Sequence, residues 1–274
     1  MLKKLLALLA ACALLNLFMT ANAFASNVRK HQQLTSDPPP ETDINSASPN
    51  IVSPAELESE DKKYPWLEDM TVELALASNY IFRGISQTEN LPAMQGGFTY
   101  TFPVGLYASI WGSNVRFVGS NASIELDTVA GWRRDFWKDY ELDVHVDRYN
   151  YPGAQDLSYN ELAASFNYKI FMLGMTYSGN AYGKHKTGTY YIGGLNYDIP
   201  SKYALNINDL SVRATFGHSS LSRSAGNSYN DYSAEITKKF GYYALTAQWT
   251  STNGRQHVSP YDGSMITGIL SAEI

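Results

Sequence analysis

The sequence is short of cysteine, of charged residues and of long hydrophobic segments. Its 274 residues contain one cysteine, Cys12, so no disulfide can form within the chain. Charged residues make up 17%, below the usual quarter, and the net charge of −5 does not suit a nucleic-acid binder. After the N-terminal region no segment approaches the 18 apolar residues that indicate a transmembrane helix. These absences exclude a disulfide scaffold, a basic nucleic-acid-binding protein and a helical membrane protein.

The N-terminal region has the pattern of a Sec signal peptide over residues 1–25. Two lysines precede an apolar run from Leu5 to Met19, and small residues follow, which predicts cleavage after Ala23 or after Ala25. The run is shorter than the roughly 20 residues of a membrane-spanning helix, which favours cleavage over a retained anchor. Leu9–Cys12 has the shape of a lipobox, so lipidation is an alternative, although the apolar run continues past it.

Residues 26–69 are polar, acidic and rich in proline and serine, as the Ser-Asp-Pro-Pro-Pro-Glu-Thr-Asp run at 36–43 shows. Such a segment buries too little apolar surface to offset the entropy of ordering it. One short helix over 54–63 is expected, because Ser53 can cap it and a proline follows. We predict a periplasmic tether; a functional plug is the alternative.

From residue 71 onward, bulky apolar residues alternate with small, polar or charged ones, for example in 124–133 and 140–147. This period of two predicts strands with one apolar and one polar face. Most of the segments have 9–11 residues, the length of a tilted strand that crosses a bilayer. The twelve segments are 71–82, 94–102, 105–114, 123–133, 139–148, 159–168, 170–178, 189–197, 210–218, 230–238, 242–250 and 264–274.

The connections between these segments alternate between long polar loops and short turns, with Asp198–Asp209 as the one long exception. Long outer loops and short periplasmic turns are typical of a bacterial outer-membrane barrel. We therefore predict an all-β protein, with a transmembrane antiparallel up-and-down β-barrel of about 12 strands over residues 70–274. A Gram-negative outer membrane would supply its lipid partners and its barrel-assembly machinery, and the oligomeric state stays open.

Several stretches resemble the TorF family of outer-membrane porins. The resemblance lies in 78–88, 92–98 and 105–114, and continues through Ile124–Gly131, Tyr149–Gly153 and Tyr159–Glu161. It covers the chain from about residue 70 onward, is dense through 165, and is looser in the C-terminal third. The resemblance implies an outer-membrane barrel with a porin role, and it brings no catalytic residues with it.

Residues 76–101 carry the most specific part of this resemblance. We expect Tyr80 and Phe82 to face lipid near the outer interface, where aromatic belts lie. Arg83 would turn into the mouth of the barrel, and Gly84–Ala93 would form the first external loop. Gly96–Gly97 would let the returning strand bend or lie close to its neighbour.

The polar face predicts the pore-lining residues. Its charged positions are Glu73, Glu125, Asp127, Glu141, Asp143, Asp147, Glu161 and Glu235, against Arg83, Arg133 and Arg213, with His145 beside them. Eight acidic against three basic positions predict a negative lumen that prefers cations, or neutral and zwitterionic solutes. The alternative is that these are hydrated or paired wall residues in a barrel filled by side chains. We expect a porin that passes small hydrophilic solutes or ions.

Other functions have weaker signals. Asp143-x-His145-x-Asp147 places three metal-ligand types on one face, but neighbours there are about 6.8 Å apart, so we predict neither a metal site nor a cofactor. A lipid-modifying enzyme would need His145 or His218 in a triad, and the chain has no Gly-x-Ser-x-Gly elbow; we expect no enzyme. A structural or adhesive barrel whose long loops bind partners is a further alternative.

Overall fold

The computed structural model describes residues 69–222, 226–253 and 259–274, which lie in a compact unit, Asp69–Ile274. The predicted signal peptide, and all but the last residue of the predicted tether, lie outside the described residues. Within the described residues no helix is both long enough and apolar enough to cross a membrane.

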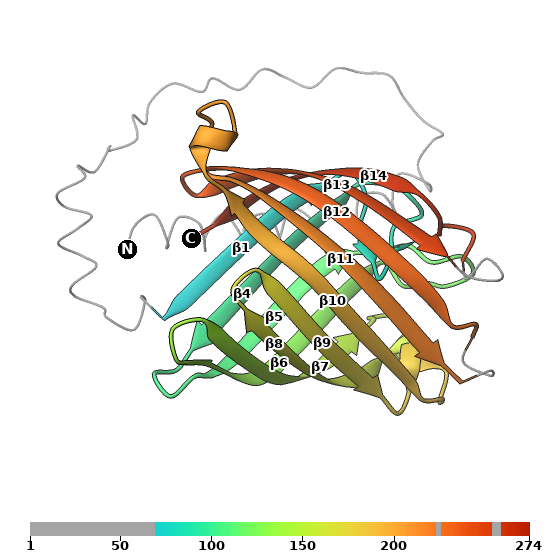
Figure 1. Cartoon of the computed structure of the whole chain (residues 1–274). Coiled ribbons are helices and arrows are strands. Elements are labelled where there is room, and N and C mark those ends of the chain that lie inside the picture. The colour runs from blue at the N-terminus through green and yellow to red at the C-terminus, as the bar shows by residue number, and fades with distance from the viewer. Residues whose placement is uncertain (1–68, 223–225, 254–258) are drawn as a thin grey trace, which may run out of the picture. The chain divides into compact units, whose positions relative to one another are not determined.

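Twelve antiparallel strands form one closed barrel, in the order β1-β14-β13-β12-β11-β10-β9-β8-β7-β6-β5-β4 (Figure 1). This confirms the predicted fold class. The strands are β1 (Met70–Ala77), β4 (Ala93–Thr101), β5 (Leu106–Asn114), β6 (Ile124–Phe136), β7 (Tyr140–Asn150), β8 (Tyr159–Tyr168), β9 (Phe171–Ser178), β10 (Gly188–Ile199), β11 (Leu210–Leu221), β12 (Tyr229–Phe240), β13 (Tyr243–Asn253) and β14 (Met265–Glu273).

The first and last strands pair to close the barrel, with Glu73 opposite Glu273 and Ala77 opposite Ile269. Closure leaves no open edge, which a bilayer requires because lipid cannot hydrogen-bond to unpaired backbone groups. Two short strands, β2 (Ile81–Phe82) and β3 (Ile85–Ser86), pair only with each other.

The outward face of the barrel is apolar. Large exposed hydrophobic residues occur at outward positions on every barrel strand except β4, including Leu173 (62% exposed), Leu245 (55%) and Ile266 (81%). The charged residues at outward positions within the strands are Arg134, Arg148 and Lys238, and each lies two residues from the end of its strand. Long basic side chains at such positions can reach the polar interface.

Inside the barrel, glycines make room for tyrosine rings of neighbouring strands. A Cβ added at Gly131 would lie 2.5 Å from the ring of Tyr107, which is opposite it in the register. A Cβ at Gly217 would similarly meet the ring and hydroxyl of Tyr190. These glycines let bulky aromatic residues lie flat on the interior wall.

The predicted alternation of long and short connections is confirmed. The long ones, at one end of the barrel, are 78–92, 115–123, 151–158, 179–187, 222–228 and 254–264; they include the 3₁₀ turns η2 (Gln155–Leu157) and η3 (Ala181–Gly183). At the other end four connections are short, and the fifth, 200–209, contains η4 (Ser201–Tyr203) and projects beyond the rim (Figure 1).

One predicted boundary is wrong. The first strand was expected over 71–82, but β1 ends at Ala77, and the connection that follows runs from Ser78 to Pro92. The reason is that residues 81–86 pair with each other and not with a neighbouring barrel strand.

Gly131→Ala tests the packing of glycine against tyrosine. The added methyl group would displace the Tyr107 ring, so we expect the barrel to lose about 1–3 kcal/mol of stability in urea unfolding from detergent or lipid. Gly268→Ala is the matched control, because nothing lies within 4 Å of a Cβ there. Equal stabilities of the two variants would contradict this role of Gly131.

Candidate functional site

A hairpin from the first long connection folds into the barrel. Arg83 (φ 48°) and Gly84 (φ 76°) join β2 to β3, and two successive positive φ angles are typical of a type I′ turn. A Cβ added at Gly84 would lie 2.8 Å from the Cβ of Asp231 and 2.5 Å from the Cγ2 of Thr252. The tip of the hairpin therefore touches the interior wall at β12 and β13.

The expectation that Tyr80 and Phe82 face lipid is wrong. The ring of Tyr80 packs against Trp111, with centroids 5.4 Å apart, and that of Phe82 against Tyr149 at 6.0 Å. Both contact the buried cluster formed by Val115, Ala122, Tyr149, Tyr151, Ala154 and Tyr159. The period-two pattern continues in the sequence beyond the end of β1, but the chain has already turned inward. Burial of these rings against the cluster stabilises the inward position.

Arg83 anchors the tip of the hairpin to the wall. Its Nη1 and Nη2 donate to the two carboxylate oxygens of Glu161 on β8, at 3.0 and 2.6 Å. The guanidinium also stacks on the rings of Phe82 and Tyr190, with centroid distances of 4.6 and 4.4 Å. Burial alone would lower the pKa of Arg83, but Tyr182 and Glu161 more than offset it and hold that pKa above its usual value. Arg83 is therefore a permanent cation inside the mouth.

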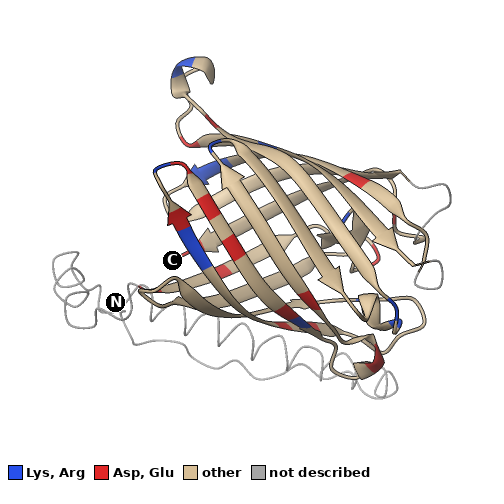
Figure 2. Cartoon of the chain, turned by 60° about the horizontal axis from the view of Figure 1, so that its bottom comes forward, with Lys and Arg blue, Asp and Glu red and all other residues tan. Residues whose placement is uncertain are grey.

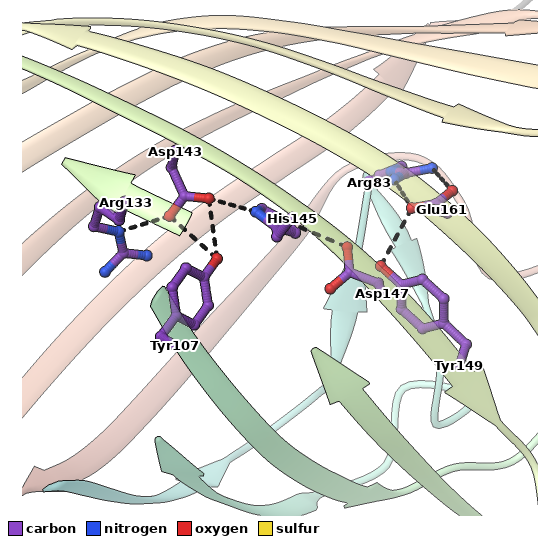
Figure 3. Close-up of polar contacts among 8 residues, drawn as sticks. All are labelled: Arg83, Tyr107, Arg133, Asp143, His145, Asp147, Tyr149 and Glu161. Carbon is purple, nitrogen blue, oxygen red and sulfur yellow. Dashed lines mark hydrogen bonds and ion pairs between the residues drawn. The ribbon is translucent and has the colours of Figure 1, made fainter. Parts of the chain in front are cut away.

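A second group of charged residues runs along β6 and β7 (Figure 3). Asp143 accepts from Arg133 Nε at 2.6 Å and from the hydroxyl of Tyr107 at 3.0 Å, and it contacts Nδ1 of His145 at 2.6 Å. The other ring nitrogen of His145 lies 3.3 Å from Asp147 Oδ2. The two carboxylates thus hold the imidazole between them on the interior face.

His145 and its neighbours form neither a metal cluster nor a catalytic triad. The described residues contain no group of three or more His, Cys, Asp or Glu that could hold a metal ion. His145 contacts carboxylates, and His218 contacts the amide of Asn230 on the outward face. No serine is a hydrogen-bond partner of either histidine among the described residues.

Glu125 and Asp127 on β6 are buried acids without a basic partner among the described residues. Glu125 is 2% exposed and accepts a 2.6 Å hydrogen bond from the hydroxyl of Tyr151. Asp127 is 8% exposed, and its Oδ1 has no hydrogen-bond partner in the described part of the chain. Burial of charge without such compensation is costly, which marks this pair as the least satisfied part of the interior.

The remaining predicted residues lie farther from this group. Glu141 accepts from Asn167 at 2.7 Å, Glu235 accepts from Gln248 at 2.9 Å, and Arg213 contacts the sulfur of Met172 at 3.5 Å. Glu73 lies opposite Glu273. The strand register places all eleven predicted strand residues on the interior face. Whether they line an open path stays a prediction.

The structure adds interior residues that the sequence reading missed. Tyr190 donates its hydroxyl to Asp231 at 3.0 Å, and Asp231 lies beside the tip of the hairpin. Asp231 has the same strand parity as Glu235, so the alternation contained the signal that could have found it. The sequence held no such signal for Tyr190, because aromatic residues occur on both faces of the strands.

The acidic residues gather on one side of the interior. Figure 2 shows charged positions concentrated on a few neighbouring strands, while others are nearly uncharged. We call six interior acids of β6, β7 and β8 the acidic stripe: Glu125, Asp127, Glu141, Asp143, Asp147 and Glu161. Across the barrel the interior positions carry hydroxyls, some paired across strands, such as Thr215 with Ser233 and Thr237 with Thr246.

A family model described as "Bacterial protein of unknown function (Gcw_chp)" matches residues 67–267. The chain belongs to the Gcw_chp family. The match spans all the barrel strands except residues 268–273 of β14. The narrower resemblance to TorF porins stays a prediction, and no curated protein matches the chain.

Solved barrels resemble the chain at low sequence identity. The KdgM porin has a TM-score of 0.49 and 8% identity, over 74% of this chain and 97% of that chain. The NanC porin has 0.46 and 8%, over 74% and 97%. Pseudomonas aeruginosa OpdK with vanillate has 0.39 and 12%, over 67% and 56%. Likenesses this weak say nothing about solutes. The assignment of the barrel fold rests on the strand pairing within this chain.

Arg83→Met tests the anchor of the hairpin. The substitution leaves Glu161 buried without a counter-ion. Breaking a buried ion pair in this way costs about 3–5 kcal/mol of stability. We expect amides of residues 80–88 to exchange hydrogen about a hundredfold faster or more. In Arg83→Met/Glu161→Gln the buried charge is gone, and protection should largely return.

Arg116→Ala is the matched control for this experiment. It breaks an ion pair with Glu89, on the same connection as Arg83, in which the arginine is 64% exposed. Exposed pairs contribute little, so exchange should stay near wild type. An unchanged exchange rate in Arg83→Met would contradict the anchoring role.

Proposed function

We propose that the protein is an outer-membrane porin that passes small hydrophilic solutes or ions and prefers cations. The observation that carries the proposal is the contrast between an apolar exterior and an interior with charged and hydroxyl side chains. An apolar exterior with basic residues only near the strand ends suits a bilayer, and a polar interior suits a water-filled path.

The preference for cations is supported by the charge balance of the acidic stripe. Its six carboxylates face two arginines, Arg83 and Arg133, together with His145. In a confined, weakly screened interior such an excess of negative charge attracts cations and repels anions. The strands opposite add hydroxyl groups beside the charged residues Arg213, Asp231 and Glu235.

The hairpin would set the narrowest part of the path. It enters the barrel after β1 and reaches Glu161, Tyr190 and Asp231 on strands of the other side. A segment that crosses the interior reduces the open cross-section and places the positive charge of Arg83 at that point. Arg83 would therefore lower both the conductance of the path and its preference for cations.

The location follows from the same proposal. A Sec signal peptide would direct the chain to the periplasm, and the barrel-assembly machinery would insert it into the outer membrane. Its partners would be outer-membrane lipids and small hydrophilic solutes. An adhesive or structural barrel remains the second candidate, favoured by the long connections at one end.

Planar-bilayer recording in a KCl gradient tests the proposed function. We expect stepwise conductance and a reversal potential of the sign that indicates cation preference. Arg83→Ala should raise conductance and increase the K⁺/Cl⁻ permeability ratio severalfold, because one charge a few ångströms from an ion is worth about 1 kcal/mol or more.

Arg148→Ala is the control. It also removes one positive charge, but from the outward face near the end of β7, so the permeability ratio should stay unchanged. Anion preference of the wild type would overturn the role of the acidic stripe. A barrel that inserts without conductance steps would favour the structural alternative.

A further inference from the structure

The end of the barrel with the long connections contains two adjoining pockets of about 500 and 440 Å³. They are within the volume range of small-molecule sites. Both are lined by Gln87, Phe117, Val118, Tyr151, Tyr159, Tyr182 and Lys184. We call this combined space the vestibule. Four of its seven shared residues are aromatic, so its walls suit a flat or apolar ligand.

The charges on the vestibule wall nearly cancel. Lys184 and Asp156 line the first pocket, one charge of each sign. Lys184 and Arg116 line the second pocket, and Arg116 is paired with Glu89 at 2.8 Å. The wall alone therefore gives no strong preference for the sign of a ligand.

Two acids lie behind the tyrosines of the wall, Glu125 and Glu161, and Glu161 is paired with Arg83. The hydroxyl of Tyr151 donates to Glu125, and that of Tyr149, beneath the stacked ring of Tyr159, donates to Glu161. Burial, and then the negative charge of Glu125, raise the pKa of Tyr151, so its phenol stays a neutral donor. A tyrosine that donates to a carboxylate has a more electron-rich ring, which strengthens attraction of a cation to its face.

Asp127 is a further acid close to the vestibule. It is more than nine-tenths buried, faces the interior, and has no hydrogen-bond partner at Oδ1 in the described part of the chain. It lies opposite Tyr149 in the register of β6 and β7, and the ring of Tyr149 stacks on that of Tyr159, which lines the vestibule. A positive ligand on the tyrosine rings would favour the ionised form of this carboxyl group.

The chain already holds one planar cation in this way. The guanidinium of Arg83 lies over the rings of Phe82 and Tyr190 and pairs with Glu161, next to the vestibule. Aromatic faces backed by carboxylates therefore accommodate a guanidinium at this end of the barrel. The vestibule repeats the combination where Phe117 packs on Tyr151, whose hydroxyl donates to Glu125.

We propose that the vestibule binds planar organic cations that carry an amidinium or guanidinium group. The inference rests on the proposed function only in placing the vestibule on the path of the solute; binding itself does not require conductance. It narrows the solute class from cations in general to flat cations with an apolar body.

Benzamidine and its neutral isostere benzamide test the proposal on the purified, folded protein by titration calorimetry. We expect saturable binding of benzamidine, about tenfold tighter than that of benzamide, as a desolvated cation–π contact implies. Glu125→Gln and Asp127→Asn should each weaken benzamidine binding about fivefold and leave benzamide unchanged. Equal affinity for the two probes, or no saturable binding of benzamidine, would overturn the proposal.

Asp135→Asn is the matched control. It removes one negative charge from the same face of β6, about 33 Å along the strand from Glu125, and benzamidine affinity should stay within about twofold. If it weakens binding as much as Glu125→Gln does, the effect arises from the net charge of the whole barrel, and the proposal that the vestibule binds the cation is overturned. Tyr151→Phe, which keeps the ring but loses the hydrogen bond to Glu125, should weaken binding without altering a strand.

Conductance separates this inference from the proposed function. If the protein conducts in KCl but does not bind benzamidine, the proposal of cation binding in the vestibule is refuted and the proposed porin function stands. If the protein binds benzamidine without conducting, the proposed porin function is refuted and cation binding in the vestibule is supported. In a conducting protein, benzamidine added on the side of the long connections should block the current, and benzamide should not.

Discussion

The lack of hydrogen-bond partners in a bilayer is the constraint on which the other features of the barrel depend. Each backbone group in the strands must pair with a neighbouring strand, so the sheet has to close. Closure between β1 and β14 then separates an outward face from an enclosed interior. The period of two in the sequence reflects that separation, and charged residues at outward positions occur only near the strand ends.

Enclosure creates a second problem, which is how to place large and charged side chains in a narrow space. Glycines opposite Tyr107 and near Tyr190 make room for the rings, and hydrogen bonds from tyrosines satisfy part of the acidic stripe. The inward hairpin supplies Arg83 as a counter-ion to Glu161. Glu125 and Asp127 receive no such counter-ion among the described residues. The hairpin therefore neutralises part of the acidic interior and leaves the neighbouring part without a counter-ion. This uncompensated part is what the proposed selection of cations depends on.

The strands, their number, and the residues on the interior face could be predicted because alternation is a local signal that survives in any barrel register. The inward fold of the first connection could not. Tyr80 and Phe82 continue the parity of β1, and nothing in the local pattern marks Ala77 as the end of the strand. Their partners, Trp111 and Tyr149, lie 31 and 67 residues farther along the chain. Contacts of that kind depend on which strands enclose the loop.

The sequence by itself determined that the chain alternates between an apolar and a polar face, that it forms twelve strands, and that all its long connections but one fall at one end. These properties follow from residue type and spacing alone. Only the tertiary structure decided that Arg83 pairs with Glu161, that His145 lies between two carboxylates, and that Asp127 is buried without a hydrogen-bond partner at Oδ1. Those facts depend on side chains from separate strands meeting inside a closed wall, and strand parity carries no information about which of them meet.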